Sequence, residues 1–187
     1  MMCVKYSQVP VISAVSGIAL GGGCELVMQS ARRVAAIESY IGLVEVGVGL
    51  LPAGGGLKEA AIRGAQGVSL AGNSNYLDFI KSAFENAAMA KVSSSAQEAM
   101  KMAYLQKGDI IVPNVYELLA LAQNQVKAMH YSGYRPPVPA LIPVGGRSVA
   151  ATVMGQVVNL RDGGFISDHD AHIAQKIIEI ITGGDVD

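Results

Sequence analysis

Three consecutive glycines, Gly21–Gly23, stand between a β-like segment and a helical one, and this junction limits the fold more than any other feature of the chain. Residues 9–16 are rich in β-branched side chains and predict a short buried strand that ends at Gly17. Residues 25–30 predict the first turns of a helix, and residues 33–37 predict a second strand. A strand, a glycine turn, a helix and a strand make a βαβ unit. We therefore expect two parallel strands with a right-handed connection.

Two carboxylates accompany the glycine turn. Glu25 follows it directly, and Glu45 comes 20 residues later (45 minus 25), inside the segment 42–47. Ligand sites of βαβ units lie at the carboxyl ends of the strands, where Gly22 and Glu25 are expected. A backbone N–H at such a turn can stabilise an oxyanion, and two carboxylates can hold and transfer protons. The alternatives are an ordinary first-turn glutamate, favoured by the helix dipole, for Glu25 and a solvated loop carboxylate for Glu45.

The composition excludes several classes of protein. The chain has 187 residues, enough for one domain with a sizeable core, and its 51% of hydrophobic against 16% of charged residues is not typical of a disordered chain. With 14 basic and 15 acidic residues, no electrostatic argument supports binding to nucleic acid. Cys3 and Cys24 are too few for a disulfide framework, so we expect reduced thiols and a cytoplasmic protein.

An apolar run over residues 9–20 follows Lys5 and resembles a secretory signal. Pro10 and Gly17 interrupt this run, and Glu25 would fall inside a membrane span that started there. We therefore expect neither a cleaved leader nor a membrane-spanning segment.

The chain becomes mainly helical after Pro52. Periodic apolar residues and breakers predict these elements: helices over 57–65, 76–90, 94–105, 114–130, 148–160 and 167–181, a strand over 110–112 and a proline-rich connector over 134–146. Asn114 and Glu117 predict a capping box at the start of one helix, and Gly183 and Gly184 predict the end of the last one.

The last predicted helix has one apolar face, formed by Ile173, Ile177, Ile178 and Ile181. Such a face either packs within its own domain or forms an assembly surface. The sequence pattern leaves both interpretations open.

Three other candidate sites have weak support. Residues 47–52 lack the third glycine of a dinucleotide fingerprint, and residues 54–59 lack the Gly-Lys-Ser/Thr of a nucleotide-binding P-loop. His169 and His172 are three residues apart, but no suitable third ligand stands out, and a helix-capping acidic turn explains the segment 168–172 more simply. We expect no metal site.

Two segments resemble the crotonase superfamily, which comprises the enoyl-CoA hydratases and isomerases. Residues 9–26 are similar to the signature segment of that family, and residues 42–56 are similar to its second catalytic segment. The resemblance implies an α/β fold, with a partial crotonase-like ββα spiral followed by a helical C-terminal region. We accordingly divide the chain into a partial crotonase core with the active-site segments (1–66) and a helical region of the same domain (67–187).

Three later segments narrow this resemblance. Residues 84–93, 133–137 and 154–169 are similar to a bacterial fusion protein in which a 3-hydroxyacyl-CoA dehydrogenase part precedes a crotonase part. The resemblance implies a role in fatty-acid β-oxidation, with an acyl-CoA thioester as substrate and no cofactor in this chain. NAD would serve only the dehydrogenase part, which this chain lacks.

The family pattern implies a role for each matching residue. The N–H of Gly22 would be one of two donors to the thioester oxygen. Glu25 would take a proton from the water that adds to C3 of trans-2-enoyl-CoA, and Glu45 would deliver a proton to C2, giving 3-hydroxyacyl-CoA. The residues expected to contact the substrate are Leu20, Gly21, Pro52, Gly54 and Gly55. Isomerases of the family can work with the second carboxylate alone, so the presence of both favours hydration and leaves isomerisation open.

Family domains have a longer first half, with further strands, the second oxyanion donor and most of the CoA contacts, and they continue beyond Gly184. The resemblance therefore implies a fragment, and we expect little hydratase activity from this chain alone. The alternative is a non-catalytic assembly fragment whose helices associate with copies of itself or with a partner. Since crotonases are commonly trimer-based, we expect a homo-oligomer.

Overall fold

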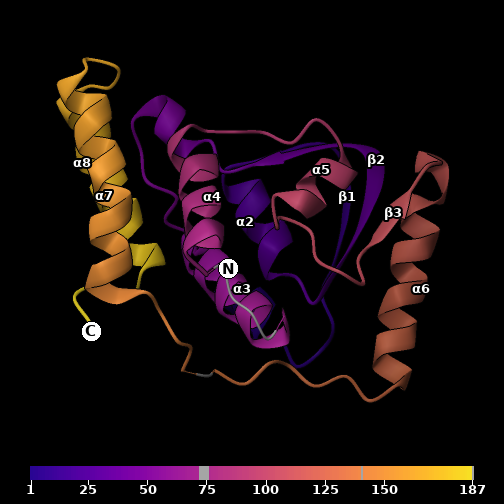
Figure 1. Cartoon of the computed structure of the whole chain (residues 1–187). Coiled ribbons are helices and arrows are strands. Elements are labelled where there is room, and N and C mark those ends of the chain that lie inside the picture. Colours follow the sequence, from indigo (N-terminus) through magenta and orange to yellow (C-terminus); the bar gives the residue numbers. More distant parts are fainter. Residues whose placement is uncertain (72–75, 140, 187) are drawn as a thin grey trace. The chain divides into compact units, whose positions relative to one another are not determined.

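The computed structural model describes residues 1–71, 76–139 and 141–186 (Figure 1). Its strands are β1 (Ile12–Leu20), β2 (Arg32–Gly42) and β3 (Ile110–Val112). Its helices and 3-10 turns are α1 (Met2–Lys5), α2 (Gly22–Gln29), η1 (Glu45–Val48), α3 (Gly56–Ala71), α4 (Tyr76–Ala88), α5 (Ala96–Lys101), η2 (Val115–Glu117), α6 (Leu118–Tyr131), α7 (Gly146–Asp162) and α8 (Asp168–Ile181).

The chain forms two compact units that alternate along the sequence. The first unit comprises Met1–Leu43, Gly54–Gly56 and Val92–Ala140. The second unit comprises Val44–Ala53, Leu57–Lys91 and Leu141–Asp187. The division of the chain near residue 66 stays a prediction.

A parallel sheet of strand order β1-β2-β3 is the centre of the first unit. Helix α2 connects β1 to β2 and contacts both strands, which confirms the α/β fold and the βαβ unit predicted from the glycine turn. The register pairs Ile12 with Arg32 and Leu20 with Gly42. The carboxyl ends of the two strands therefore meet beside Gly21, the residue that precedes α2.

Strand β1 begins at Ile12, three residues later than predicted, and it continues past residue 16 because Gly17 does not end it. Gly17 has a φ of +67°, a conformation that favours glycine, and the strand continues to Leu20. The register between β1 and β2 shifts at this point, between Val15 and Gly17. The hydroxyl oxygen of Ser39 lies 2.7 Å from the carbonyl oxygen of Ala36 and 3.2 Å from that of Val15, and so offers a donor where the ladder is interrupted. Glycine here permits a bulge.

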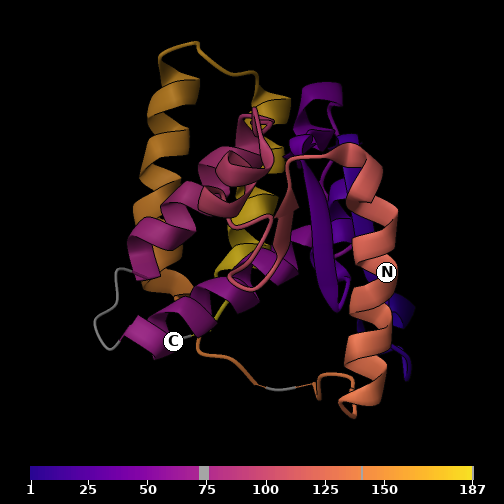
Figure 2. The same ribbon diagram turned by 90° about the vertical axis from the view of Figure 1, so that its right-hand side faces the viewer.

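Helix α6 covers part of one face of the sheet, as its contacts with β1 and β2 show (Figure 2). A cluster of buried apolar side chains joins the two layers, formed by Val34, Val112, Leu118 and Ala122, with Ile12, Ile110 and Leu121 packed against it. Burial of this face is what holds the short strand β3 in the sheet, since three residues contribute few ladder hydrogen bonds.

A buried ion pair fixes the segment that leads into β3. The Nε of Arg33 lies 2.7 Å from Oδ2 of Asp109, and the two side chains are only 6% and 2% exposed. Arg33 also donates to Gln106 Oε1 at 2.9 Å and to the carbonyl oxygen of Ser30 at 3.1 Å. The guanidinium is therefore well supplied with acceptors, which a buried cation requires.

Two of the predicted helices differ in detail from the structure. Helix α5 ends at Lys101 and not at residue 105, since Ala103 has a φ of +61°, outside the helical region. The predicted capping box at Asn114 was wrong in form. Its side chain accepts from the N–H of Tyr116 at 3.1 Å, and Glu117 accepts from the Asn114 amide at 3.2 Å. The residues after Asn114 form the 3-10 turn η2, and α6 begins only after this turn, at Leu118.

The remaining predicted elements are present. β3 has the predicted bounds, and α4, α7 and α8 begin and end within two residues of the predicted ranges, whereas β2 and α3 are longer. The connector is irregular over 134–139 and 141–145, and residue 140 lies outside the described residues.

The helices of the second unit bury the apolar face of α8. Ile173, Ile177, Ile178 and Ile181 are between 0% and 5% exposed, and α8 contacts α4 and α7. Of the two interpretations of this face, packing within its own domain is confirmed, and this face is not an assembly surface.

Helix α8 has well-defined ends. Ser167 and Asp170 form a capping box at its start, with the Ser167 hydroxyl 2.7 Å from Oδ2 of Asp170. The last helical residues are followed by Gly183 and Gly184, both with φ above +80°. The predicted glycine stop is confirmed.

Within the described part of the chain, no helix combines the length and the apolar character that crossing a membrane requires.

Candidate active site

The glycine turn lies at the carboxyl end of β1 and starts helix α2 earlier than predicted. Gly21 has φ +54° and ψ −124°, a combination that L-residues avoid, and its N–H donates to the carbonyl oxygen of Gly42 at 2.9 Å. The helix begins at Gly22. Gly22 and Gly23 are exposed, and a Cβ added to either would meet no atom within 4 Å. Since the first N–H groups of a helix lack intrahelical acceptors, this end is suited to a developing negative charge.

Glu25 stands in the first turn of α2 and is almost entirely buried, with 3% of the residue exposed. Its Oε2 accepts a hydrogen bond from the N–H of Gly54 at 3.0 Å, and its Oε1 accepts one from the N–H of Gly56 at 2.9 Å. An ordinary first-turn glutamate is exposed to water and does not bind a distant loop. Glu25 is thus held by the segment 54–56, which we call the glycine cradle.

Helix α2 holds the glycine cradle at a second point, one turn beyond Glu25. The Nε2 of Gln29 donates to the carbonyl oxygen of Gly54 at 2.8 Å, and Gln29 is 2% exposed. Glu25 and Gln29 are four residues apart, so both side chains lie on one face of the helix. Gln29 was not predicted as a site residue, because its contact with Gly54 joins two segments that are 25 residues apart in the sequence.

Close approach explains why the cradle needs glycine. A Cβ on Gly54 would overlap the carboxylate of Glu25, and a Cβ on Gly56 would come within 2.9 Å of Leu43 Cδ2. Gly55 between them has a φ of +108°, which is open to glycine but strained for other residues. The three glycines therefore serve backbone geometry and the contact with Glu25.

Glu45 belongs to the second unit, where it is half-buried and begins the turn η1. The carbonyl oxygen of Glu45 accepts from the N–H of Leu50 at 3.0 Å, and the N–H of Gly49 donates to the carbonyl oxygen of Val46 at 2.9 Å. His169 Nε2, from the start of α8, lies 3.0 Å from the carbonyl oxygen of Gly49. The backbone around Glu45 is therefore anchored within its own unit.

The expected site residues fall into two groups. In the first unit, Glu25 is in direct contact with Gly54, and Gly55 belongs to the same cradle. The other expected residues of this unit lie at the end of β1 and the start of α2: Leu20, Gly21 and Gly22. Glu45 and the buried Pro52 belong to the second unit. The sharing of one site by Glu25 and Glu45 stays a prediction.

The acidic turn at the start of α8 is a helix cap. Oδ2 of Asp170 accepts hydrogen bonds from the hydroxyl of Ser167 at 2.7 Å and from its N–H at 3.1 Å, and these bonds lower the pKa of Asp170. In the ranges that the structure describes, no group of three or more His, Cys, Asp or Glu side chains is placed to hold a metal ion.

A sequence comparison shows which family the first part of the chain resembles. Residues 1–74 match the sequence model of the enoyl-CoA hydratase/isomerase family. This part of the chain, which contains both segments quoted for the resemblance, is similar to that family, the crotonase family.

Individual relatives place the chain more closely. Over 186 residues it is 41% identical to a Bacillus subtilis (strain 168) protein with the name "Probable 3-hydroxyacyl-CoA dehydrogenase". The match covers 100% of this chain and 23% of that protein. The predicted resemblance to part of a longer bacterial protein with a 3-hydroxyacyl-CoA dehydrogenase name is confirmed.

Solved structures support the fold. An enoyl-CoA hydratase from Bacillus anthracis superposes with a TM-score of 0.51 at 23% identity, over 96% of this chain and 56% of that one. A hydratase-family structure from Thermobifida fusca in complex with CoA gives a TM-score of 0.52 at 20% identity, over 93% and 55%. The chain thus spans little more than half of these solved relatives.

Proposed function

We propose that this chain carries the acid–base carboxylates and one oxyanion donor of an enoyl-CoA hydratase, which adds water to trans-2-enoyl-CoA to give 3-hydroxyacyl-CoA. The observation that carries this proposal is the buried carboxylate of Glu25, each oxygen of which accepts one backbone N–H from the glycine cradle. Such a carboxylate has a fixed orientation next to the start of α2, where the N–H of Gly22 is available to a thioester oxygen.

Glu25 has hydrogen-bond acceptor sites left over, and this supports a role in binding and deprotonating a water molecule. A carboxylate has about four lone-pair sites, and the N–H groups of Gly54 and Gly56 use two of them. The remaining sites can orient a water molecule and receive its proton. Rigid anchoring is what a general base needs, because proton transfer requires hydrogen-bond reach in a fixed geometry.

The proposed reaction has two stages, the addition of water at C3 and the protonation of C2. The oxygen of water forms a bond to C3 while its proton moves to Glu25, and the π electrons of the C2–C3 double bond move toward the thioester as an enolate. The N–H of Gly22 and a second donor stabilise the enolate oxygen, and Glu45 then gives a proton to C2. Both carboxylates have a task in hydration, whereas isomerisation requires only Glu45, so hydration is favoured.

We propose that the complete active site also needs parts of a larger protein. The chain spans 23% of its Bacillus subtilis relative, and we infer that the second oxyanion donor and most CoA contacts come from outside this chain. Removing one oxyanion donor costs a rate factor of about 10²–10³, so we expect the chain alone to be slow. In the whole protein the product would pass to NAD-dependent 3-hydroxyacyl-CoA dehydrogenation; the hydratase step itself needs no cofactor. Cys3 and Cys24 are thiols, in keeping with a cytoplasmic location.

A non-catalytic assembly role is the second candidate, and helix α6 favours it. Leu119 and Tyr131 on α6 are 68% and 83% exposed, and Tyr116 just before it is 92% exposed. Exposed large side chains along one segment of the surface are available to a contact with another chain. The expected homo-oligomer would use this surface.

Product analysis separates these functions. The chain is incubated at a concentration equal to that of crotonyl-CoA and, separately, of 3-butenoyl-CoA, and the products are identified by chromatography and mass. We expect slow formation of 3-hydroxybutyryl-CoA from crotonyl-CoA. Conversion of 3-butenoyl-CoA to crotonyl-CoA without hydration would indicate an isomerase. No conversion by a folded, self-associating chain would support the assembly role.

A further inference from the structure

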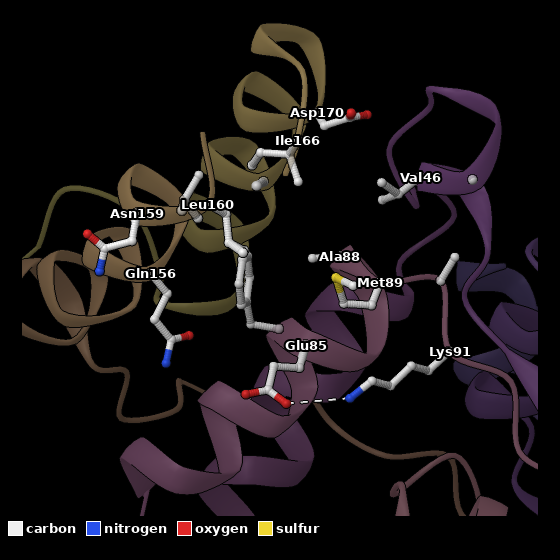
Figure 3. A pocket seen from close by; sticks show the side chains of 15 residues that line it. Val46, Glu85, Ala88, Met89, Lys91, Gln156, Asn159, Leu160, Ile166 and Asp170 are labelled. Atoms are coloured by element: carbon white, nitrogen blue, oxygen red, sulfur yellow. Dashed lines mark hydrogen bonds and ion pairs between the residues drawn. The ribbon is translucent and has the colours of Figure 1, made fainter. Parts of the chain in front are cut away.

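Each of the two units contains a pocket, and the two pockets differ in how their charged groups are paired. The pocket of the second unit has a volume of about 730 Å³, and at its edge Lys91 Nζ lies 3.5 Å from Glu85 Oε2 (Figure 3). The pocket of the first unit has a volume of about 390 Å³, and Arg32 is part of its lining. Among the described residues, no carboxylate forms an ion pair with Arg32.

The pocket of the first unit, which we call the α6 pocket, lies at the end of helix α6 from which the connector leaves (Figure 1). Its lining includes Arg32, Gln125, Ala128, Met129 and Tyr134. Its volume is within the usual range of small-molecule sites.

The chain returns to the α6 pocket directly after the helix, through a Schellman motif. Gly133 has a φ of +79°, which favours glycine, and its N–H donates to the carbonyl oxygen of His130 at 3.1 Å. The N–H of Tyr134 donates to the carbonyl oxygen of Met129 at 3.0 Å. This motif holds Tyr134 next to Met129, so that both line the pocket.

Arg32 differs from its neighbour Arg33 in its surroundings. Successive strand residues point to opposite faces of a sheet. On one face, Arg33 has the buried carboxylate of Asp109 as its partner. On the other face, which α6 covers, Arg32 Nη1 donates to Gln125 Oε1 at 3.1 Å. This bond uses one of the five N–H donors of the guanidinium, and the others can bind an anion.

The charges around the α6 pocket favour an anion. Residues 118–139 contain no Asp or Glu, but they contain the exposed Lys127 and Arg135. The carbonyl oxygens at the end of α6 would oppose an anion through their partial negative charge. They already accept hydrogen bonds from the N–H groups of residues 132–134, which reduces this opposition.

Two neutral side chains add hydrogen-bond donors. The oxygen of the Gln125 amide faces Arg32, so its NH₂ group can donate elsewhere. The hydroxyl of Tyr134 is buried and has no hydrogen-bond partner within the part of the chain that the structure describes. A buried hydroxyl without a partner is uncommon in proteins, and an anion in the pocket would supply an acceptor.

We propose that the α6 pocket binds a small organic oxyanion, in which a phosphate or carboxylate group is attached to an apolar body. The planar guanidinium of Arg32 suits two oxygens of either group. Met129 and the ring of Tyr134 offer contacts to the apolar body.

The α6 pocket is separate from the proposed active site. Arg32 pairs with Ile12 at the start of β1, whereas Gly22 lies beyond the other end of that strand, about 25 Å away. The inference therefore goes beyond the proposed function and does not depend on it.

Binding is tested by NMR titration of the whole chain with phenyl phosphate, benzoate and the uncharged benzyl alcohol. The two anions should cause saturable shifts at Arg32, Gln125 and Tyr134. Benzyl alcohol should bind at least about tenfold more weakly, because it offers no charge-assisted hydrogen bond. The anion with the higher affinity shows whether the site is built for phosphate or for carboxylate.

A pair of variants with the same change of charge localises the effect. Arg32→Gln removes the guanidinium, and Lys127→Gln is the matched control at an exposed position of α6 outside the pocket lining. We expect Arg32→Gln to weaken anion binding at least about tenfold and Lys127→Gln to weaken it less than about twofold. Should Arg32→Gln fail to fold, Tyr134→Phe removes only a hydroxyl and is expected to weaken binding about threefold or more.

Three results would overturn the inference: equal affinity for benzyl alcohol and the two anions, equal anion affinity of the pocket variants and Lys127→Gln, or no saturable binding of either anion. Failure of crotonyl-CoA hydration would remove the proposed function and leave the anion site unaffected.

Discussion

Glu25 accepts a hydrogen bond from the backbone N–H of Gly56 across 31 residues of sequence, at 2.9 Å. The other oxygen of the same carboxylate accepts a hydrogen bond from the N–H of Gly54 at 3.0 Å. This relationship converts a helix glutamate into a fixed group beside the start of α2, and it explains why glycine stands in the cradle.

Substituting Gly54 by alanine should destabilise the first unit, because the new Cβ would overlap the carboxylate of Glu25. We expect a loss of about 2–3 kcal/mol in the free energy of unfolding, from overpacking and a weakened hydrogen bond. Gly23→Ala is the matched control, since a Cβ there meets nothing within 4 Å. Urea unfolding measures both. Equal stability of the two variants would show that the cradle is not held against Glu25.

Glu25→Gln should also destabilise the chain, although it keeps size and shape. The amide NH₂ would face one of the two cradle N–H groups, which removes one hydrogen bond and leaves a donor against a donor. The expected cost is about 1–3 kcal/mol. The exposed Glu38 provides the control, Glu38→Gln, for which thermal unfolding should show no change. A stable Glu25→Gln variant would mean that the carboxylate does not hold the cradle.

Two ion pairs with the same N···O distance should differ widely in their contribution to the free energy of unfolding. Arg33–Asp109 and Lys176–Glu179 both have N···O distances of 2.7 Å, but only the first is buried. Asp109→Ala leaves a buried guanidinium without its partner and should cost roughly 3–5 kcal/mol. Glu179→Ala should cost less than about 0.5 kcal/mol. Chemical denaturation of both variants measures the two losses in the free energy of unfolding. Losses of similar size would contradict the role of the buried pair in fixing the segment before β3.

The cap of α8 should respond to acid. The hydrogen bonds from Ser167 lower the pKa of Asp170, so its contribution to stability is present above the ordinary aspartate pKa of about 3.9 and is lost as pH falls through the lowered value. A carboxyl carbon NMR titration of Asp170 measures this directly. Ser167→Ala removes the hydroxyl donor and should raise the pKa of Asp170 toward the ordinary value. An unchanged titration midpoint in Ser167→Ala would mean that the Ser167 hydroxyl is not the main hydrogen-bond partner of Asp170.

Much of the fold was predictable because the glycine turn, the β-branched runs and the capping residues act locally. β3 and α8 illustrate this, since their ends are marked by Pro113 and by Ser167, next to the elements themselves. Gly17 was misjudged because a glycine that permits a bulge and one that ends a strand look alike without the partner strand. The contact of Glu25 with the cradle, and the part of Gln29 in it, depend on the approach of two segments, and no local pattern specifies that distance.

The central claim is that the carboxylates of this chain carry out hydration, and the rate of crotonyl-CoA hydration by the Glu45→Gln variant tests it most directly. Glu45 is half-buried, so this substitution should leave the fold intact, as circular dichroism would verify. With chain and crotonyl-CoA at equal concentrations, loss of the enoyl-thioester absorbance should be slow for the unsubstituted chain and at least about 10²-fold slower for the variant. Equal rates for the two proteins, or no hydration above the uncatalysed reaction, would contradict the claim.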